Sequence, residues 1–166
     1  MRAVILFAHG SLLCGAGQAL LVHAARLREL GIAPLVEIGY LNYSEPPFLE
    51  AVAKCTEQGA TQIIVTPYFL VPGKFVKVDL PKAVAEAESK FPNIAFILAE
   101  AIGFEERLAD ALLRSAQEAR PPEAWGRDVE AATEFCRPSP ECPLYLTPFC
   151  PKCPGDRDPL EETLTA

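Results

Sequence analysis

Strand-like apolar runs alternate with helix-like patterns along the first 120 residues, and this alternation restricts the possible folds more than any other feature. The strand-like runs are Ala3 to Ala8, Leu35 to Leu41, Gln62 to Thr66 and Ile94 to Ala99. The helical patterns cover Gln18 to Leu30, the stretch from Pro46-Pro47 to near Gly59, the residues after Pro81, and about Phe104 to Ala119. Strands that alternate with helices pair in parallel through right-handed crossovers. We therefore predict an α/β fold, an open parallel sheet of about four strands with helices on both faces.

The segment 121–166 differs in composition from the rest of the chain. The chain carries a formal net charge of -7, and this segment holds 4 basic and 9 acidic side chains, a net of -5. It also holds 9 of the 16 prolines and 4 of the 6 cysteines. We expect an α/β domain over residues 1–120 and an irregular, acidic, Cys- and Pro-rich extension over residues 121–166.

The composition also argues against several classes of protein. Nucleic-acid-binding surfaces concentrate Lys and Arg, so this acidic chain is not expected to bind DNA or RNA. Charges interrupt the longest apolar stretches before they reach the length of a membrane span, and the pattern of a signal peptide is missing. We expect a cytoplasmic protein with neither a nucleic-acid nor a membrane partner.

Polar and aromatic residues follow three of the predicted strands, in the segments 9–11, 40–43 and 67–81. The carboxyl ends of parallel strands meet at one edge of a sheet, where α/β proteins bind their ligands. We therefore expect these segments to converge on one pocket. His9, one of only two histidines, directly follows the first strand and is the leading functional candidate, with a hydrogen bond to a neighbouring loop as the structural alternative. His23 is interpreted as a structural or solvent-facing residue.

Three motifs point to a known family when they are taken together. They are His9-Gly10-Ser11 after the first strand, Tyr40-Leu41-Asn42 after the second, and a pattern of apolar strand, Pro, aromatic-Leu, Gly and Asp-Leu-Pro over residues 63–81. As a set they resemble the short sirohydrochlorin chelatases of the CbiX/SirB type, class II enzymes that insert cobalt, nickel or iron into a tetrapyrrole in cobalamin and sirohaem synthesis. The resemblance covers about residues 1–120. It implies a lyase with a tetrapyrrole substrate and a homodimer in which two short chains match one full-length enzyme.

Two of the three metal-site positions of that family carry other residues here. Family members typically have His after the first strand, Glu after the second, and a second His two residues after the loop glycine, and the matching residues are His9, Asn42 and Phe75. Insertion needs a ligand for the divalent ion and a base for the two pyrrole protons. Asn42 is a weak neutral ligand and a candidate substrate contact, while Phe75 can only pack against the ring. His9 is predicted to contact the metal.

Further residues of these segments are candidates for substrate contacts. The resemblance implies that Tyr68 packs on the ring and that Lys74 and Lys77 pair with its carboxylates, as Lys does in charge-assisted hydrogen bonds. Ordinary solvated lysines are the alternative for both positions. Ser11 is a candidate polar contact, and its position is also typical of a helix N-cap.

Four cysteines of the extension fall close together in the chain: Cys136, Cys142, Cys150 and Cys153. In a cytoplasmic chain such a group indicates a metal site rather than disulfides. Three of the four precede proline, which favours an iron–sulfur cluster, and zinc is the alternative ligand. Unligated thiols, or disulfides in an extracellular protein, are the structural alternative. Cys14 and Cys55 are expected to be buried apolar residues.

These residues support three hypotheses about function. The leading hypothesis is a chelatase of this family that binds a tetrapyrrole and inserts or holds a divalent metal. The alternative is a non-catalytic protein that binds a finished metallo-tetrapyrrole, or a redox or assembly partner that acts through an iron–sulfur cluster. The third is an enzyme in which the cluster or another subunit supplies the metal ligand and base that the pocket lacks, with a substrate that need not be sirohydrochlorin. The sequence leaves open whether the chain is an enzyme.

Overall fold

The computed structural model describes residues 1–11 and 17–121 of the chain. The chain divides into two compact units, residues 1–10 with 19–119, and residues 11–18 with 120–166. The first unit contains the α/β fold, apart from Gln18 at the start of its first helix.

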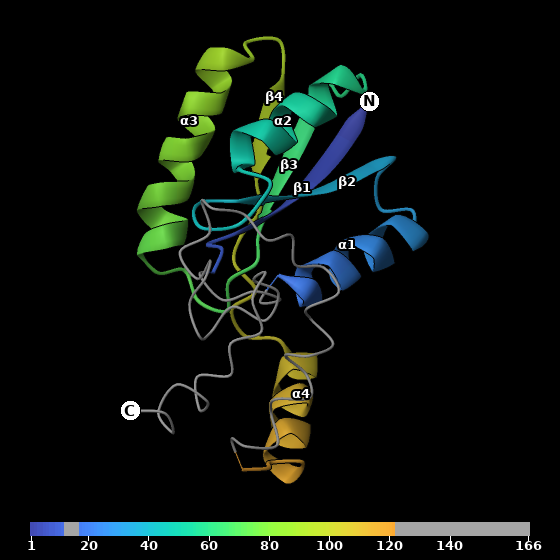
Figure 1. Cartoon of the computed structure of the whole chain (residues 1–166), viewed down its shortest axis with the longest axis vertical. Coiled ribbons are helices and arrows are strands. Elements are labelled where there is room, and N and C mark those ends of the chain that lie inside the picture. Colours follow the sequence, from blue (N-terminus) through green and yellow to red (C-terminus); the bar gives the residue numbers. More distant parts are fainter. Residues whose placement is uncertain (12–16, 122–166) are drawn as a thin grey trace, which may run out of the picture. The chain divides into compact units, whose positions relative to one another are not determined.

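Strands and helices alternate along this unit as predicted (Figure 1). Their bounds are β1 (Arg2–Ala8), α1 (Gln18–Glu29), β2 (Leu35–Tyr40), α2 (Phe48–Glu57), β3 (Gln62–Pro67), α3 (Leu80–Lys90), β4 (Ala95–Leu98) and α4 (Glu106–Gln117). Each limit that was predicted lies within two residues of the observed one, and no end was predicted for the helix that follows Pro81. The prediction is confirmed because apolar periodicity, and Pro and Gly residues at the ends of helices, act locally on the backbone.

The segment 67–81 was predicted as a loop, and this prediction is wrong in part. It contains a short π-helix, η1 (Phe75–Asp79), that continues directly into α3. The N–H of Leu80 donates to the carbonyl of Phe75, five residues earlier, as a π-helical turn requires. A single turn of this kind is too short to produce a periodic pattern in the sequence.

The four strands form one parallel sheet in the order β2-β1-β3-β4, which confirms the predicted fold class. In this order β1 lies between β2 and β3. Ala8 pairs with Tyr40 on one side, and Phe7 pairs with Pro67 on the other. The segments after β2 and β3 therefore leave the sheet on either side of the residue that follows β1.

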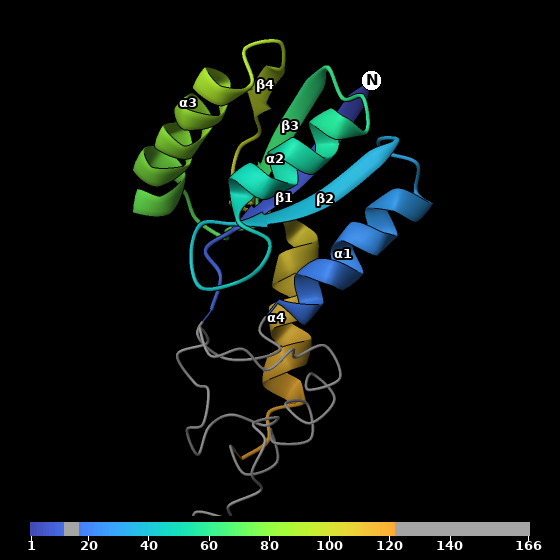
Figure 2. The ribbon, with the colours of Figure 1, turned by 45° about the horizontal axis from the view of Figure 1, so that its top comes forward.

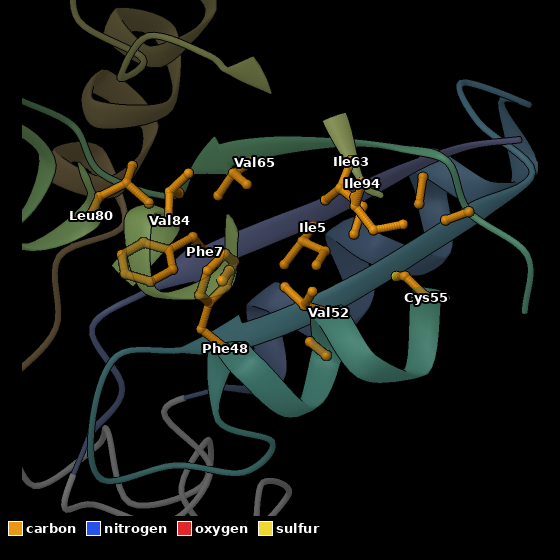
Figure 3. Packing of buried hydrophobic residues seen from close by; sticks show 14 residues of the cluster. Ile5, Phe7, Phe48, Val52, Cys55, Ile63, Val65, Leu80, Val84 and Ile94 are labelled. Carbon is orange, nitrogen blue, oxygen red and sulfur yellow. The ribbon is translucent and has the colours of Figure 1, made fainter. Parts of the chain in front are cut away.

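Helices cover both faces of the sheet, α1 on one face and α2 with α3 on the other (Figure 2). Figure 3 shows the larger core, in which Ile5 and Phe7 of β1 pack with Val52 of α2 and with Leu80 and Val84 of α3. On the opposite face Val4 and Leu6 pack with α1. Because side chains on both faces of β1 are buried, its apolar run has no polar alternation.

The last strand and helix are less covered than the rest. β4 is an edge strand, and Ile97 and Leu98 are 45% and 41% exposed. No residue of α4 is buried, and its Leu112 and Leu113 are exposed. None of the helices in the described ranges is long and apolar enough to cross a membrane.

Candidate functional site

The site begins where β1 ends, at the half-buried His9 and the following Gly10. The chain leaving β2 continues beside β1 past the last residue of either strand. The N–H of Leu41 donates to the carbonyl of Ala8 over 2.8 Å, and the N–H of Asn42 donates to the carbonyl of His9 over 2.9 Å. These two hydrogen bonds hold the backbone of the two segments together.

Gly10 is needed for this close approach. Its φ is +87°, a conformation that costs a residue with a Cβ roughly 1–2 kcal/mol. A Cβ built on Gly10 would lie 1.7 Å from the carbonyl oxygen of Asn42, far inside contact distance. The His-Gly pair is thus a structural requirement, since only glycine lets the backbone of Asn42 reach His9.

The segment after Asn42 presents Tyr43 to the site. The N–H of Ser44 donates to the carbonyl of Asn42 over 2.7 Å, and Tyr43 between them has a positive φ of 61°. Its side chain is 60% exposed, and its ring lies edge-on to the His9 ring with 5.6 Å between centroids. Tyr43 was not predicted as a site residue, although an aromatic residue next to Asn42 was a visible signal.

Phe75, at the start of η1, approaches His9 more closely than Tyr43 does. The two ring centroids are 4.3 Å apart with an interplanar angle of 48°. Phe75 also stacks on Phe69 at 6.0 Å, and Phe69 lies 6.3 Å from the fully buried Phe7. A continuous series of rings therefore links the core to His9, and each contact of this kind stabilises by roughly 0.5–1.5 kcal/mol.

The imidazole of His9 has one nitrogen near the backbone. Nδ1 lies 3.2 Å from the carbonyl oxygen of Gly10. In the tautomer with its proton on Nδ1, this nitrogen donates to that oxygen and Nε2 keeps a lone pair for a metal ion. Within residues 1–11 and 17–121 no group of three or more His, Cys, Asp or Glu is placed to hold a metal. Among these residues His9 therefore offers a single imidazole ligand rather than a complete coordination shell.

The predicted substrate contacts from the segment 67–81 divide into two groups. Lys74 and Lys77 are exposed near Phe75, and the Nζ of Lys74 lies 3.9 Å from Oδ2 of Asp79. Tyr68 lies instead against His23 of α1, with ring centroids 5.5 Å apart. Of the two interpretations of His23, structural or solvent-facing, its exposure supports the second, but its contact with Tyr68 was not anticipated.

The predictions for Ser11 and for Cys55 can be compared with the structure, whereas those for the other cysteines cannot. Ser11 belongs to the second compact unit, and it does not cap α1, because that helix begins at Gln18. Cys55 is fully buried and unpaired, as expected. The remaining cysteines lie outside the described residues: Cys14, Cys136, Cys142, Cys150 and Cys153.

Comparison with known proteins supports the resemblance seen in the sequence. The model of the CbiX family matches residues 3–119. A sirohydrochlorin cobaltochelatase of Methanocaldococcus jannaschii is 40% identical over 88 residues, which are 53% of this chain and 62% of that protein. A sirohydrochlorin cobaltochelatase of Sulfolobus acidocaldarius is 34% identical over 119 residues, 72% of this chain and 93% of that protein.

Solved structures show the same fold. The sirohydrochlorin chelatase SirB of Bacillus subtilis, solved in complex with cobalt, superposes with a TM-score of 0.66 at 27% identity over 80% of this chain and 60% of SirB. A CbiX protein of Marinobacter aquaeolei superposes with a TM-score of 0.55 at 26% identity over 71% of this chain and 96% of that protein. The matched region thus spans nearly all of some relatives and little more than half of others.

Proposed function

This chain belongs to the CbiX family, and from that premise we propose that it binds a tetrapyrrole of the sirohydrochlorin type and inserts a divalent metal ion into it. Cobalt, nickel or iron is the metal substrate. The observation that carries the proposal is the position of His9, whose imidazole follows β1 and contacts the rings of Tyr43 and Phe75. A metal ligand beside aromatic rings suits a flat macrocycle that presents a metal at its centre.

Each side chain has a role in this proposal. Nε2 of His9 contacts the metal. Phe75 and Tyr68 offer aromatic surfaces to the ring, as does Tyr43. The ammonium groups of Lys74 and Lys77 neutralise its carboxylates.

Asn42 completes the proposed substrate contacts of the first compact unit, and Ser11, which belongs to the second unit, stays a separate prediction. Neither can act as a base at neutral pH. Neither residue therefore accepts the two pyrrole protons that the metal ion displaces.

A second candidate function is to hold a metallo-tetrapyrrole without inserting its metal. The observation in its favour is the ring of Phe75, which lies 4.3 Å from His9 at the position where the family typically has a second histidine. With a single imidazole, the site has the axial ligand that a finished metal complex needs. It lacks a base at the two positions, Asn42 and Phe75, that usually supply ligands.

Two measurements on the purified protein distinguish these functions. Titration with sirohydrochlorin should give saturable fluorescence quenching that weakens in His9→Ala and not in Arg26→Ala, a change at an exposed ion pair on α1. An insertion assay with cobalt, nickel and iron should then give turnover above the spontaneous rate. Binding without turnover, with activity gained by the double variant Asn42→Glu/Phe75→His, favours the holding function. Absence of binding contradicts both.

We also propose a homodimer as the working form. The exposed apolar residues of β4 and α4 provide a surface for a second copy, and longer relatives such as SirB contain additional chain beyond the matched region. Light scattering should give twice the chain mass. Leu112→Lys/Leu113→Lys should give one chain mass with the thermal midpoint of the folded unit retained. A wild-type protein that is monomeric at micromolar concentration contradicts the dimer.

For the extension we propose a metal site formed by Cys136, Cys142, Cys150 and Cys153, with an iron–sulfur cluster favoured over zinc. Four thiolates satisfy either metal, and they stay reduced in the cytoplasm. Protein purified without oxygen should contain iron and sulfide and absorb in the visible range, and Cys150→Ser/Cys153→Ser should lose both. A colourless protein that contains stoichiometric zinc would indicate a zinc site instead of an iron–sulfur cluster. Absence of both metals contradicts the site.

A further inference from the structure

A second imidazole lies at the same edge of the sheet as His9. The chain has two histidines, and the second, His23, projects from α1 with its ring centroid 5.5 Å from that of Tyr68 and an interplanar angle of 43°. Both side chains are exposed, Tyr68 to 39%. The proposed function uses the ring of Tyr68 but assigns no role to its hydroxyl or to His23.

The register of the strands places the pair next to the end of β1. The N–H of Tyr68 donates to the carbonyl of Phe7 over 2.7 Å, so Tyr68 lies beside Ala8. Side chains alternate between the faces of a strand, and Ala8 belongs to the core on the α1 face. Tyr68 is on that same face, since it contacts His23 of α1.

His9 lies on the opposite face. It follows Phe7 by two residues, and its ring contacts Phe75, which connects through Phe69 to the core on the α2 and α3 face. The two histidines of the chain therefore flank the end of β1, one on each face of the sheet. A flat ligand that lies across this edge meets both.

The pair has hydrogen-bond donors and little structural role. Leu20 and Ala24 are the residues of α1 that are buried against the sheet, whereas His23 is directed to solvent. An imidazole N–H and a phenol O–H are both donors, and a protonated imidazole adds a positive charge. Two donors side by side match the two oxygens of a carboxylate.

We propose that His23 and Tyr68 bind a carboxylate of the tetrapyrrole on the α1 face of the sheet, the face opposite to Phe75. This inference rests on the proposed function and adds a second contact region to it. The pair would orient the macrocycle by its acidic side chains while His9 contacts the metal at its centre. A divalent ion bound by the imidazole and the phenolate is the competing occupant.

Titrations of variants with two forms of the ligand test this proposal. Sirohydrochlorin and its fully methyl-esterified form are titrated into wild type, His23→Gln, His23→Lys and Tyr68→Phe, with fluorescence quenching as the readout. We expect His23→Gln and Tyr68→Phe to bind the free acid roughly three- to tenfold more weakly, which is the loss of one hydrogen bond. Both should bind the ester as wild type does. His23→Lys, which places an ammonium donor at this position, should retain binding of the free acid.

Arg26→Gln is the matched control, because Arg26 is an exposed hydrogen-bond donor of α1 that pairs with Glu29. It should change neither titration. Equal thermal midpoints for all variants establish that the fold is intact.

Three results would overturn the inference. In the first, His23→Gln binds the free acid as tightly as wild type does. In the second, the variant loses the same affinity for the free acid and for the ester. The third is a titration with cobalt alone in which His23→Gln and His23→Lys both lose binding, because this identifies a metal site. A wild-type protein that binds neither form contradicts the proposed function and the inference together, whereas binding with unchanged His23→Gln contradicts the inference alone.

Discussion

The two faces of the sheet are formed by the same strands, but the core under α2 and α3 is larger than the core under α1. On the α2 and α3 face fourteen buried residues form one core, and aromatic rings extend it from Phe7 through Phe69 and Phe75 to His9. On the α1 face nine residues form a smaller core, and the ring of the exposed His23 contacts the exposed Tyr68. The comparison teaches that rings extending from the core pack against the His9 imidazole, whereas the His23 imidazole is exposed and contacts an exposed ring.

Removing a large side chain from each core should give the largest difference between the faces. Phe7→Ala should lower the free energy of unfolding by about 3–5 kcal/mol, because Phe7 is fully buried and contacts both Phe48 and Phe69. Leu20→Ala on the α1 face should cost about 2–3 kcal/mol, at the low end for buried leucines. Urea unfolding of both variants measures the values. Equal costs would contradict the difference in core depth.

Titration of Cys55 tests whether water reaches the larger core, the one under α2 and α3. Burial, with a further contribution from Glu37, raises the pKa of the Cys55 thiol from 9.0 to about 11, while Lys54 lowers it. Because the folded pKa is the higher one, this thiol stabilises the fold fully below pH 9, and the contribution is lost between pH 9 and about 11. Over that range wild type should lose about 2–3 kcal/mol more than Cys55→Ala. A constant difference between the two proteins across this pH range would show that the thiol is accessible to water.

Replacing Gly10, which follows His9 at the end of β1, with any residue that has a Cβ should destabilise the fold. Gly10 and Gly59 have nearly the same φ, +87° and +88°, but a Cβ on Gly59 meets nothing within 4 Å. Gly10→Ala should therefore cost about 1–3 kcal/mol more than Gly59→Ala, because it adds overpacking to the same backbone strain. Thermal unfolding compares the two. Similar midpoints would mean that the Asn42 backbone moves away without cost.

The smallest effects concern the orientation of the two imidazoles. Phe75→Leu removes two ring contacts, with His9 and Phe69, and should cost about 1 kcal/mol, the low end for two contacts, because Phe75 is 36% exposed. Nuclear magnetic resonance of the two histidines should show the His9 ring signal shift while the His23 signal stays, since an aromatic ring next to a proton changes its resonance. Tyr68→Leu should produce the reverse pattern. A shift of both signals in either variant would contradict two separate aromatic environments.

Local signals in the sequence predicted much of this molecule. The apolar run before His9 predicted a strand buried on both faces, and β1 is such a strand. The Pro and Gly residues around α2 predicted its limits because they act on the backbone wherever the chain lies. The position of His9 at the carboxyl edge of the sheet followed from the same local pattern, since a residue after a parallel strand is at that edge.

Contacts between distant segments were decided only by the tertiary structure. Tyr43 reaches His9 through a positive φ and through hydrogen bonds between two strand ends, and neither has a signal in the order of residues. Phe75 meets His9 because a π-helical turn directs it there, and His23 meets Tyr68 because β3 pairs with β1 beneath α1. The sequence by itself determined the elements and the histidine at the end of β1, since these depend on interactions within a few residues. Which aromatic rings surround each histidine depends on strand order, register and backbone geometry, and these arise only when the whole sheet packs.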